Sequence, residues 1–600
     1  MCGIAGMVGG APPDPRTLAA MALAVAHRGP DGQAVWHDDA CGLAFRRLAI
    51  IDLDERSMQP MTLGPLTLVF NGEIYDYRER REELRALGHQ FRTEGDAEVL
   101  LHAWAQWGEG ALDRVNGMFA LAVWDAQRRA LTLAADPFGE KPLLWARDGA
   151  RLLFASDARA LIAAAPALRA PDPRALAPFL ALGAAPVAPD TFFAGIRRLP
   201  GAHLLRFRDG RVTQRRYWTP RTIDVPREPA AHLRELLLDA IRLRLRADVP
   251  VGTSLSGGVD SSGIVALSAH LAGDHRRHAF TARFPGFERD EWSFAHETAQ
   301  AAGVIEHHAV EPTAAALLDD LDTLVADLEE PAASTSVYAQ WRVARAARAA
   351  GVTVMLDGQG ADELFAGYPA LIGWALRSQP PRVAALRDPV ERRWLARALG
   401  AERLPEPLAR RHRARLATPY AAPETAAAAA AATRPPDLGG RDPLRRELLR
   451  QAFATRLPEL LRYADRDSMA HAREVRLPFL DRRIAELALS LPANLLYRRG
   501  ETKAVLRDAL RGVVPDRVLD RREKVGYEPP QARWMADPAL AARAREVLLD
   551  PGARTAPLLD RGALEADARA WRDPAGAWRA LSLELWLRAF ERVPEPAPVA

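Results

Sequence analysis

The sequence predicts an α/β protein built from two domains. Its 600 residues exceed what one hydrophobic core usually spans. Before about Pro200, short strands with alternating apolar residues dominate and helices lie between them, which is typical of a layered α/β domain. From about Glu228, strands and helices alternate along the chain, which predicts a doubly wound, mostly parallel sheet covered on both faces.

Apolar residues in the first domain recur with a period of two or about 3.6, which locates its strands and helices. The expected strands cover 66–70, 119–123, 131–133 and 152–154, and the expected helices cover 18–26, 78–87 and 98–107. Arg16 and the run 18–26 also have the pattern of a secretion signal. Asp14 and the prolines before it favour a helix instead.

The same patterns locate the strands and helices of the second domain. The expected strands cover 249–255, 278–284, 304–310 and 352–356, and the expected helices cover 233–245, 259 onward, 292–302, 314–328 and 337–349. The poly-alanine tract Ala426–Ala432 is flanked by prolines and followed by two glycines, which predicts a loop or linker.

Composition restricts the class of protein and its partners. The net charge is 81 − 77 = +4, and no basic run indicates nucleic-acid binding. No apolar run approaches the length of a membrane span. Two cysteines cannot form a disulfide framework, which favours a reducing compartment, the cytoplasm.

Residues 256–262, Ser-Gly-Gly-Val-Asp-Ser-Ser, lie between an expected strand and an expected helix. Exposed N–H groups at a helix N-terminus and the absence of large side chains favour phosphate binding there. Asp260 would repel a phosphate unless a cation lies between them, so we interpret it as a Mg²⁺ ligand. The alternative is a Gly-rich turn with a Ser or Asp cap.

Cys2 follows the initiator Met directly. Removal of that Met would leave a cysteine whose free α-amine, with a pKa near ~8, can act as the base for its own thiol. Such a residue suits acyl transfer. The alternative is an ordinary cysteine after Met.

Polar residues follow the expected strands of the first domain. The Asn71 amide and the Gly72 N–H could donate to a developing oxyanion, although Asn-Gly also forms type I′ hairpin turns. Arg47 and Asp96 would fit the carboxylate and ammonium of an amino acid; alternatively, each is a surface charge.

In the second domain, ligands are expected beyond the carboxyl ends of the strands. The loops 256–262 and 357–363 and the stretch after Ala282 fall there. Asp260 and Asp362 could therefore meet around one Mg²⁺ that bridges phosphates. Alternatively, 357–363 is a Gly-rich turn that caps the following helix.

The first domain resembles the N-terminal-nucleophile glutaminase domain of class II amidotransferases. The matching stretches are 2–6, 27–32, 47–52, 59–60, 71–75, 95–96 and 136–143. The resemblance implies an αββα sandwich over residues 2–215, with Cys2 as nucleophile and Asn71 and Gly72 as the oxyanion hole. The glutamine-binding residues that it implies are Arg47, Leu48, Ala49, Ile50, Ile51, Asn71, Gly72, Glu73 and Asp96.

The second domain is similar to the ATP-pyrophosphatase domain of glutamine-dependent asparagine synthetases, over residues 228–590 and with extra helices. The supporting stretches include 462–470, 474–481 and 503–507. The resemblance implies that Asp260 and Asp362 bind Mg²⁺. The ATP-binding residues that it implies are Leu255, Ser256, Gly257, Gly258, Asp260, Ser261, Ser262, Ala282, Asp357, Gly358, Lys503 and Lys524, where Lys524 fits a solvated helix face equally well.

This resemblance implies a ligase that uses glutamine, aspartate and ATP as small-molecule partners, with no nucleic acid and no membrane. A homodimer is compatible with the sequence. Two residues depart from the family pattern. Gln359 replaces a Glu that would act as a base, and Asp467 replaces an Asn near the acceptor. Glu363, a phosphate oxygen or water would then deprotonate ammonia, or the acceptor differs from aspartate. A glutaminase with a non-catalytic nucleotide domain is the further alternative.

Overall fold

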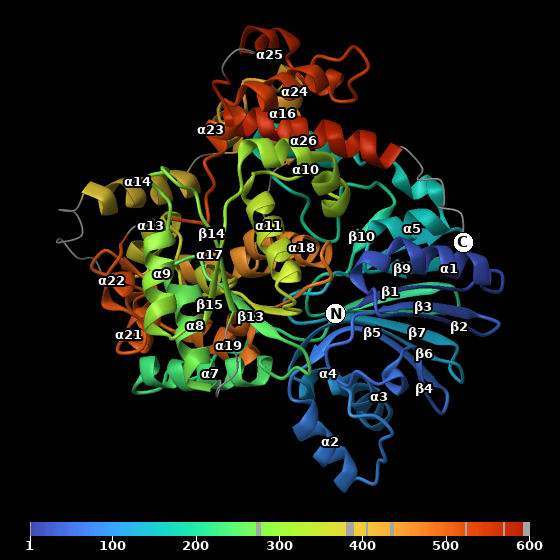
Figure 1. The fold of residues 1–600 in the computed structure, drawn as a ribbon. Helices are drawn as coiled ribbons and strands as arrows, with labels where there is room; N and C mark the ends of the chain where they lie inside the picture. Colours follow the sequence, from blue (N-terminus) through green and yellow to red (C-terminus); the bar gives the residue numbers. More distant parts are fainter. Residues whose placement is uncertain are drawn as a thin grey trace.

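The computed structural model describes residues 2–271, 278–379, 389–403, 406–432, 437–522, 525–567 and 571–591. Figure 1 shows two layered parts side by side. The N-terminal part, blue to cyan, carries two stacked sheets, and the green to orange part surrounds a third sheet. Lys524, one of the residues expected to bind ATP, lies outside the described residues.

Two six-stranded antiparallel sheets form the N-terminal sandwich. The first has the order β10-β8-β9-β1-β3-β2, with β1 Gly3–Val8, β2 Gly32–His37, β3 Cys41–Arg47, β8 Leu144–Asp148, β9 Arg151–Ala155 and β10 Ile196–Arg198. The second has the order β12-β11-β7-β6-β5-β4, with β4 Met61–Leu63, β5 Leu66–Ile74, β6 Gly117–Asp125, β7 Ala130–Ala135, β11 His203–Arg208 and β12 Arg211–Arg216.

Helices cover the outer face of each sheet, which confirms the expected αββα layering (Figure 1). Helices α1 (Pro15–Ala24) and α5 (Ala158–Ala164) pack on the first sheet, and α2 (Tyr77–Ala86) and α3 (Asp96–Trp107) pack on the second. Strand β1 is therefore buried along its whole length, because one of its faces meets the helices and the other meets the second sheet.

Asn71 and Gly72 lie inside a strand, and the expected strand end at residue 70 is wrong. Strand β5 continues to Ile74, and its residues Asn71 and Gly72 stand opposite Ala120 and Phe119 of β6. The hairpin-turn alternative is therefore excluded, since β6 keeps pairing with β5 through this stretch.

The third sheet is parallel throughout, as expected for a doubly wound fold. Its order is β15-β14-β13-β16-β17, with β13 Val251–Ser254, β14 His278–Ala282, β15 Glu306–Val310, β16 Val354–Leu356 and β17 Glu474–Arg476. The helices around it include α7 (Pro229–Arg244), α8 (Val259–Leu271), α9 (Trp292–Ala301), α10 (Ala314–Leu328), α11 (Ser336–Ala349) and α18 (Arg456–Met469). The strand order reverses between β13 and β16, so a ligand crevice is expected at their carboxyl ends.

The poly-alanine tract forms a helix, so the expected loop is wrong. Helix α16 (Pro423–Ala432) packs on α6 (Pro173–Leu182) of the N-terminal part, where Ala429 and Ala181 are fully buried. Alanine has the highest helix propensity, and its small side chain lets two helices approach closely.

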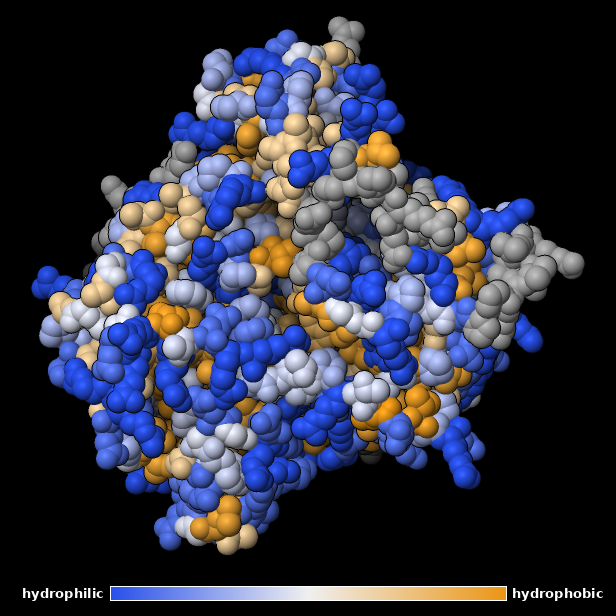
Figure 2. All heavy atoms as spheres, turned by 180° about the vertical axis from the view of Figure 1, so that it is seen from behind, coloured by the Kyte–Doolittle hydropathy of each residue, from blue (hydrophilic) through white to orange (hydrophobic). Residues whose placement is uncertain are grey.

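The face seen in Figure 2 carries hydrophilic side chains over most of its area, with hydrophobic ones in small scattered groups. Among the described residues, no helix combines the length and apolar character that crossing a membrane requires.

Candidate active sites

The first residue of interest, Cys2, directly precedes β1 at the centre of the first sheet. Its backbone nitrogen donates to Asn71 Oδ1 across the sandwich at 2.9 Å, and its Sγ lies 3.9 Å from the carbonyl oxygen of Leu48. The side chain is 8% exposed, and burial raises the pKa of the thiol. A nearby base is therefore needed to form the thiolate at neutral pH.

Asn71 provides an unused hydrogen-bond donor beside Cys2, and Gly72 follows it in β5. Asn71 is fully buried, and its Nδ2 has no hydrogen-bond partner among the described residues. A Cβ on Gly72 would lie 2.1 Å from the carbonyl oxygen of Met118, so only glycine fits there. An orphan buried donor costs free energy unless a ligand satisfies it, and an oxyanion on a Cys2-bound acyl group would do so.

One cavity collects the other residues expected to bind glutamine. Asn71 is the one member of the expected set that does not line this cavity, and its hydrogen bond places it beside Cys2. The lining includes Cys2, Arg47, Leu48, Ala49, Ile50, Ile51, Gly72, Glu73 and Asp96. Arg47 is buried and donates to the carbonyl oxygens of Asp52 and Asp54, which holds its guanidinium at the cavity wall.

Two buried acids give this cavity a cation-binding wall. Burial raises the pKa of Asp96 to about 6 and raises that of Glu73 well above its ordinary value. Asp96 Oδ2 accepts from the Ile74 N–H at 2.8 Å, which orients the carboxyl group. Glu73 Oε2 has no hydrogen-bond partner among the described residues. An ammonium group would favour the ionised form of both acids.

The second site begins at the turn from β13 into α8. Gly257 has φ +79°, and a Cβ there would lie 2.8 Å from Ala295 N in α9. The Ser261 hydroxyl accepts from Ser256 N at 3.1 Å and lies 3.0 Å from Ser256 Oγ. These contacts fix the conformation of the turn at the N-terminus of a 13-residue helix, where backbone N–H groups can bind an anion.

Asp260 and Asp362 meet, as the sequence predicted. Both carboxylates contact the Lys503 ammonium: Asp260 at 2.5 Å and 2.7 Å, and Asp362 at 2.6 Å. Two carboxylates that contact one nitrogen can also contact one cation. Gly358 permits this approach of the two loops, because its Cβ would lie 2.9 Å from the Asp260 Cβ.

A cavity of about 210 Å³ lies beside this cluster. Of the residues expected to bind ATP, Ser256, Asp260, Ser261, Asp357 and Gly358 line it, and Asp362 does as well. The other described members of this set do not line the cavity: Leu255, Gly257, Gly258, Ser262, Ala282 and Lys503, of which Lys503 contacts Asp260 and Asp362. The Leu255 side chain packs in a buried cluster with Val265 and Ala279, so contact with a nucleotide would require its backbone.

The residues that depart from the family pattern line the same cavity. Among the described residues, Gln359 Oε1 and both carboxyl oxygens of Asp467 are buried without hydrogen-bond partners. Burial raises the pKa of Asp467 well above its ordinary value. Glu363 accepts from the Tyr368 hydroxyl at 2.5 Å, and burial and the neighbouring Asp362 raise the pKa of Glu363 to about 7.

Buried arginines connect the two sites, and the sequence reasoning assigned them no role. Arg28 donates to the Cys2 carbonyl oxygen at 3.2 Å and pairs with Asp465 of α18, 437 residues away in the chain. Arg476 of β17 lies 3.3 Å from Glu73 and 2.5 Å from Glu474. Hydrophobic periodicity carries no signal for such distant pairs, although both arginines lie in recognised motifs.

An apolar cluster also lies between the two cavities. The first part of the chain contributes Leu48, Ile50, Tyr75 and Met118, and the second contributes Leu243, Val354, Met469 and Ala472. Leu48 and Ile50 also line the Cys2 cavity, and Met355, next to Val354, lines the second cavity.

A glutaminase-type sandwich joined to a doubly wound parallel sheet defines a two-domain glutamine-dependent amidotransferase. The chain belongs to the asparagine synthase family, whose model matches residues 232–588, and a glutamine amidotransferase domain matches residues 1–218.

Curated relatives agree with this assignment. Asparagine synthetase [glutamine-hydrolyzing] 3 of Bacillus subtilis is 30% identical over 87% of this chain and 86% of that protein. Asparagine synthetase [glutamine-hydrolyzing] 1 of the same organism is 32% identical over 85% and 83%. Amidase chry2 of Gibberella zeae is 28% identical over 86% and 85%.

Proposed function

We propose that this enzyme makes asparagine: aspartate, glutamine, ATP and water give asparagine, glutamate, AMP and diphosphate. The observation that carries the proposal is the presence of two separate cavities in one chain with a buried apolar cluster between them. One cavity has the features of an amide-hydrolysing site and the other those of a phosphate-binding site. We expect a cytoplasmic enzyme with no nucleic acid or membrane as partner, and a homodimer is compatible with the sequence.

In the first cavity, Cys2 attacks the side-chain amide of glutamine once the initiator Met is removed. The freed α-amine takes the thiol proton and passes it to the leaving nitrogen, so that the carbon–nitrogen bond breaks and ammonia leaves as the Cys2 thioester forms. Asn71 Nδ2 and the Gly72 N–H donate to the oxyanion. Arg47 holds the substrate carboxylate, and Glu73 and Asp96 hold its ammonium, while Leu48–Ile51 form the wall. Water then hydrolyses the thioester to glutamate.

In the second cavity, the loop 256–262 with Asp357 and Gly358 holds ATP, and a carboxylate oxygen of the acceptor attacks the α-phosphorus. Asp260 and Asp362 would hold Mg²⁺, which would neutralise charge on the phosphates. Lys503, and Lys524 in the same role, would neutralise the leaving diphosphate. Ammonia then attacks the acyl-adenylate, and AMP leaves.

Glu363 is the group in this cavity best suited to take a proton from the attacking ammonia. Gln359 cannot act as a base, whereas a carboxyl group with a pKa of about 7 exchanges protons readily at neutral pH. The Tyr368 hydroxyl orients it.

The apolar cluster offers ammonia a path from one cavity to the other. Ammonia in water is mostly ammonium, which cannot act as a nucleophile, and a charged ammonium is costly to place among apolar side chains. A route past Leu48, Ile50, Val354 and Met469 therefore favours passage of the neutral form.

Substitution of the nucleophile tests this division of labour. Cys2→Ala is expected to abolish glutamine hydrolysis and glutamine-dependent AMP formation, while AMP formation with added ammonium salt persists. Cys41→Ala, a change at the other buried cysteine, is the control and should keep both activities. Loss of both activities in Cys2→Ala, with the fold intact by circular dichroism, contradicts the proposal.

A different acceptor acid is the second candidate, because Asp467 stands where the family pattern has an Asn. Its unpartnered, buried carboxyl group at the cavity wall would pair with an ammonium or hydroxyl donor, which aspartate or another amino or hydroxy acid would supply. A screen of carboxylic acids for AMP formation with ammonium decides between the two. If AMP forms with another acid but not with aspartate, that acid is the acceptor and the product is not asparagine.

The products formed from ATP distinguish the proposed ligase from a glutaminase whose second domain only senses nucleotide. A sensor would bind ATP without cleaving it, whereas the proposed ligase releases AMP and diphosphate. Formation of ADP would contradict the acyl-adenylate step itself.

A further inference from the structure

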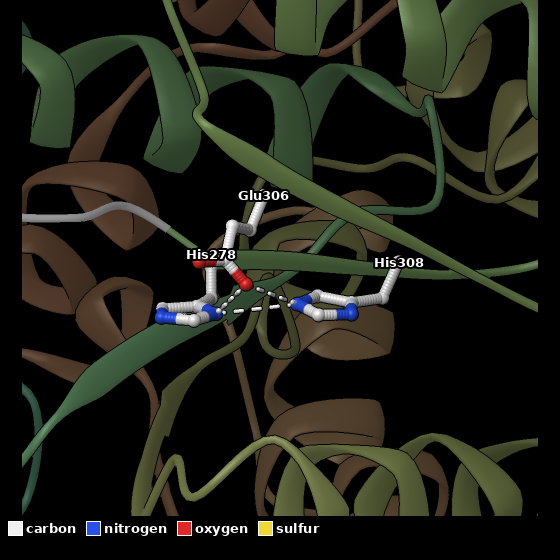
Figure 3. A group of neighbouring side chains, drawn as sticks. All are labelled: His278, Glu306 and His308. Carbon is white, nitrogen blue, oxygen red and sulfur yellow. Dashed lines mark hydrogen bonds and ion pairs between the residues drawn. The ribbon is translucent and has the colours of Figure 1, made fainter.

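A cluster of two histidines and one glutamate lies on the edge strand β15 of the parallel sheet and on its neighbour β14. In the register of β14 and β15, His278 stands opposite Glu306, and His308 follows Glu306 by two residues. Residues two apart in a strand share a face, so the three side chains converge. Figure 3 shows them pointing toward one another.

The ligand-type atoms of these side chains are spaced as a transition metal would require. His278 Nδ1 lies 3.2 Å from His308 Nε2 and 3.5 Å from Glu306 Oε2, and His308 Nε2 lies 3.7 Å from Glu306 Oε2. In a tetrahedral Zn²⁺ site with bonds of about 2.0–2.2 Å, neighbouring ligand atoms are about 3.3–3.6 Å apart. The strands therefore need no rearrangement to accept the ion.

From this geometry we propose that His278, Glu306 and His308 bind a divalent transition-metal ion of the Zn²⁺ type. Two imidazole nitrogens and one carboxylate oxygen favour Zn²⁺ over Mg²⁺, which prefers oxygen ligands. A fourth position is left for water. The three residues are partly buried, so the ion can enter from solvent.

Packing fixes the rings before any ion binds. The His308 ring stacks on Phe280 with centroids 4.5 Å apart and an interplanar angle of 7°, and it is parallel to the His278 ring. The neighbouring His307 lies on the opposite face, where its Nε2 meets the Thr281 hydroxyl at 2.8 Å. His307 thus provides a control of the same residue type on the same strand.

The site differs in position and chemistry from the proposed Mg²⁺ site. His278 and Glu306 begin their strands, whereas Asp260 and Asp362 follow the carboxyl ends of β13 and β16. An ion at the amino end of β14 and β15 would join the edge strand to its neighbour. It would raise the stability of the folded state according to its concentration relative to its Kd.

The test uses the full-length enzyme after treatment with a chelator, in excess Mg²⁺ so that the acidic loops are occupied. Co²⁺ is titrated, and the visible absorption of a tetrahedral N/O complex is recorded; Zn²⁺ should then displace Co²⁺ and raise the melting temperature. The wild type and His307→Gln should bind one equivalent. Binding to His308→Gln should be at least tenfold weaker.

Glu306→Gln provides a second variant, because Glu306 is partly exposed and its change should leave folding intact. It should also bind Co²⁺ at least tenfold more weakly than the wild type. Equal Co²⁺ binding by the wild type and either variant, or no binding by the wild type, overturns the proposal.

Discussion

At the scale of single residues, the close approach of neighbouring backbone limits which side chains fit beside the first cavity. Gly72 is the clearest case, because the β6 backbone lies where a Cβ would stand. The preceding residue of β5, Asn71, accepts a hydrogen bond from the Cys2 backbone nitrogen. The close packing of β5 on β6 at Gly72 therefore also fixes the position of the proposed oxyanion hole.

Gly72→Ala is expected to lower glutamine hydrolysis by about 10²-fold or more, because its Cβ would collide with the β6 backbone and displace the Gly72 N–H, and loss of one oxyanion donor costs that much in other enzymes. The melting temperature should also fall, since β5 and β6 must separate. Gly110→Ala is the control, because φ at Gly110 is −64° and the nearest atom to its added Cβ lies 4.0 Å away. Full glutaminase activity in Gly72→Ala would contradict the assignment.

The pKa of Glu363 predicts a pH dependence of the synthetase step. Because the deprotonated carboxylate is the base, glutamine-dependent AMP formation should rise as pH increases through about 7. Glu363→Gln should lose this inflection and most of the activity. ATP–diphosphate exchange with the acceptor should persist in this variant, because activation precedes ammonia attack. An unchanged pH profile in Glu363→Gln would mean that another group acts as the base.

At the scale of elements, the poly-alanine helix shows how packing selects a conformation. Helix α16 buries Ala429 against α6 and leaves Ala427 exposed. A tract of identical residues has no amphipathic pattern, so the buried face is visible only once α6 is in place.

Ala429→Glu should lower stability by about 3 kcal/mol or more, which is roughly 2–4 °C in melting temperature for a chain of this size, because an unpaired charge would be buried. Ala427→Glu changes the same residue type on the exposed face and should shift the melting temperature little. The measurement is thermal unfolding by circular dichroism. Equal shifts in both variants would mean that α16 does not pack on α6 in solution.

At the scale of the whole molecule, the apolar cluster lies between two cavities that the chain builds separately. Val354 of β16 is fully buried within it. A larger side chain there would obstruct a path without touching either set of reacting groups.

Val354→Phe should keep glutamine hydrolysis and ammonium-dependent AMP formation but lower glutamine-dependent AMP formation severalfold. Ammonia would then escape to solvent, so glutamate would exceed AMP in the products. Val354→Ile adds one methylene and should change this ratio little. A ratio of glutamate to AMP of one in Val354→Phe would mean that ammonia does not pass Val354.

Motif order and local pattern were sufficient to predict the αββα sandwich, the doubly wound parallel sheet and the proximity of Asp260 to Asp362, whereas the role of Cys2 stays a prediction. These rest on short-range rules: strand and helix periods, turn residues and the carboxyl ends of parallel strands. The end of β5 and the helical state of α16 could not be predicted this way, because β6 and α6 determine them.

The sequence by itself determined the class of protein, since the order of its motifs defines the family, and it predicted which residues carry the chemistry, since that prediction depends on residue type and order. The tertiary structure alone decided which buried groups lack partners, how Arg28 and Arg476 connect the sites, and that His278, Glu306 and His308 converge. Such contacts join residues far apart in the chain, and only the packed fold sets the distance and burial between them.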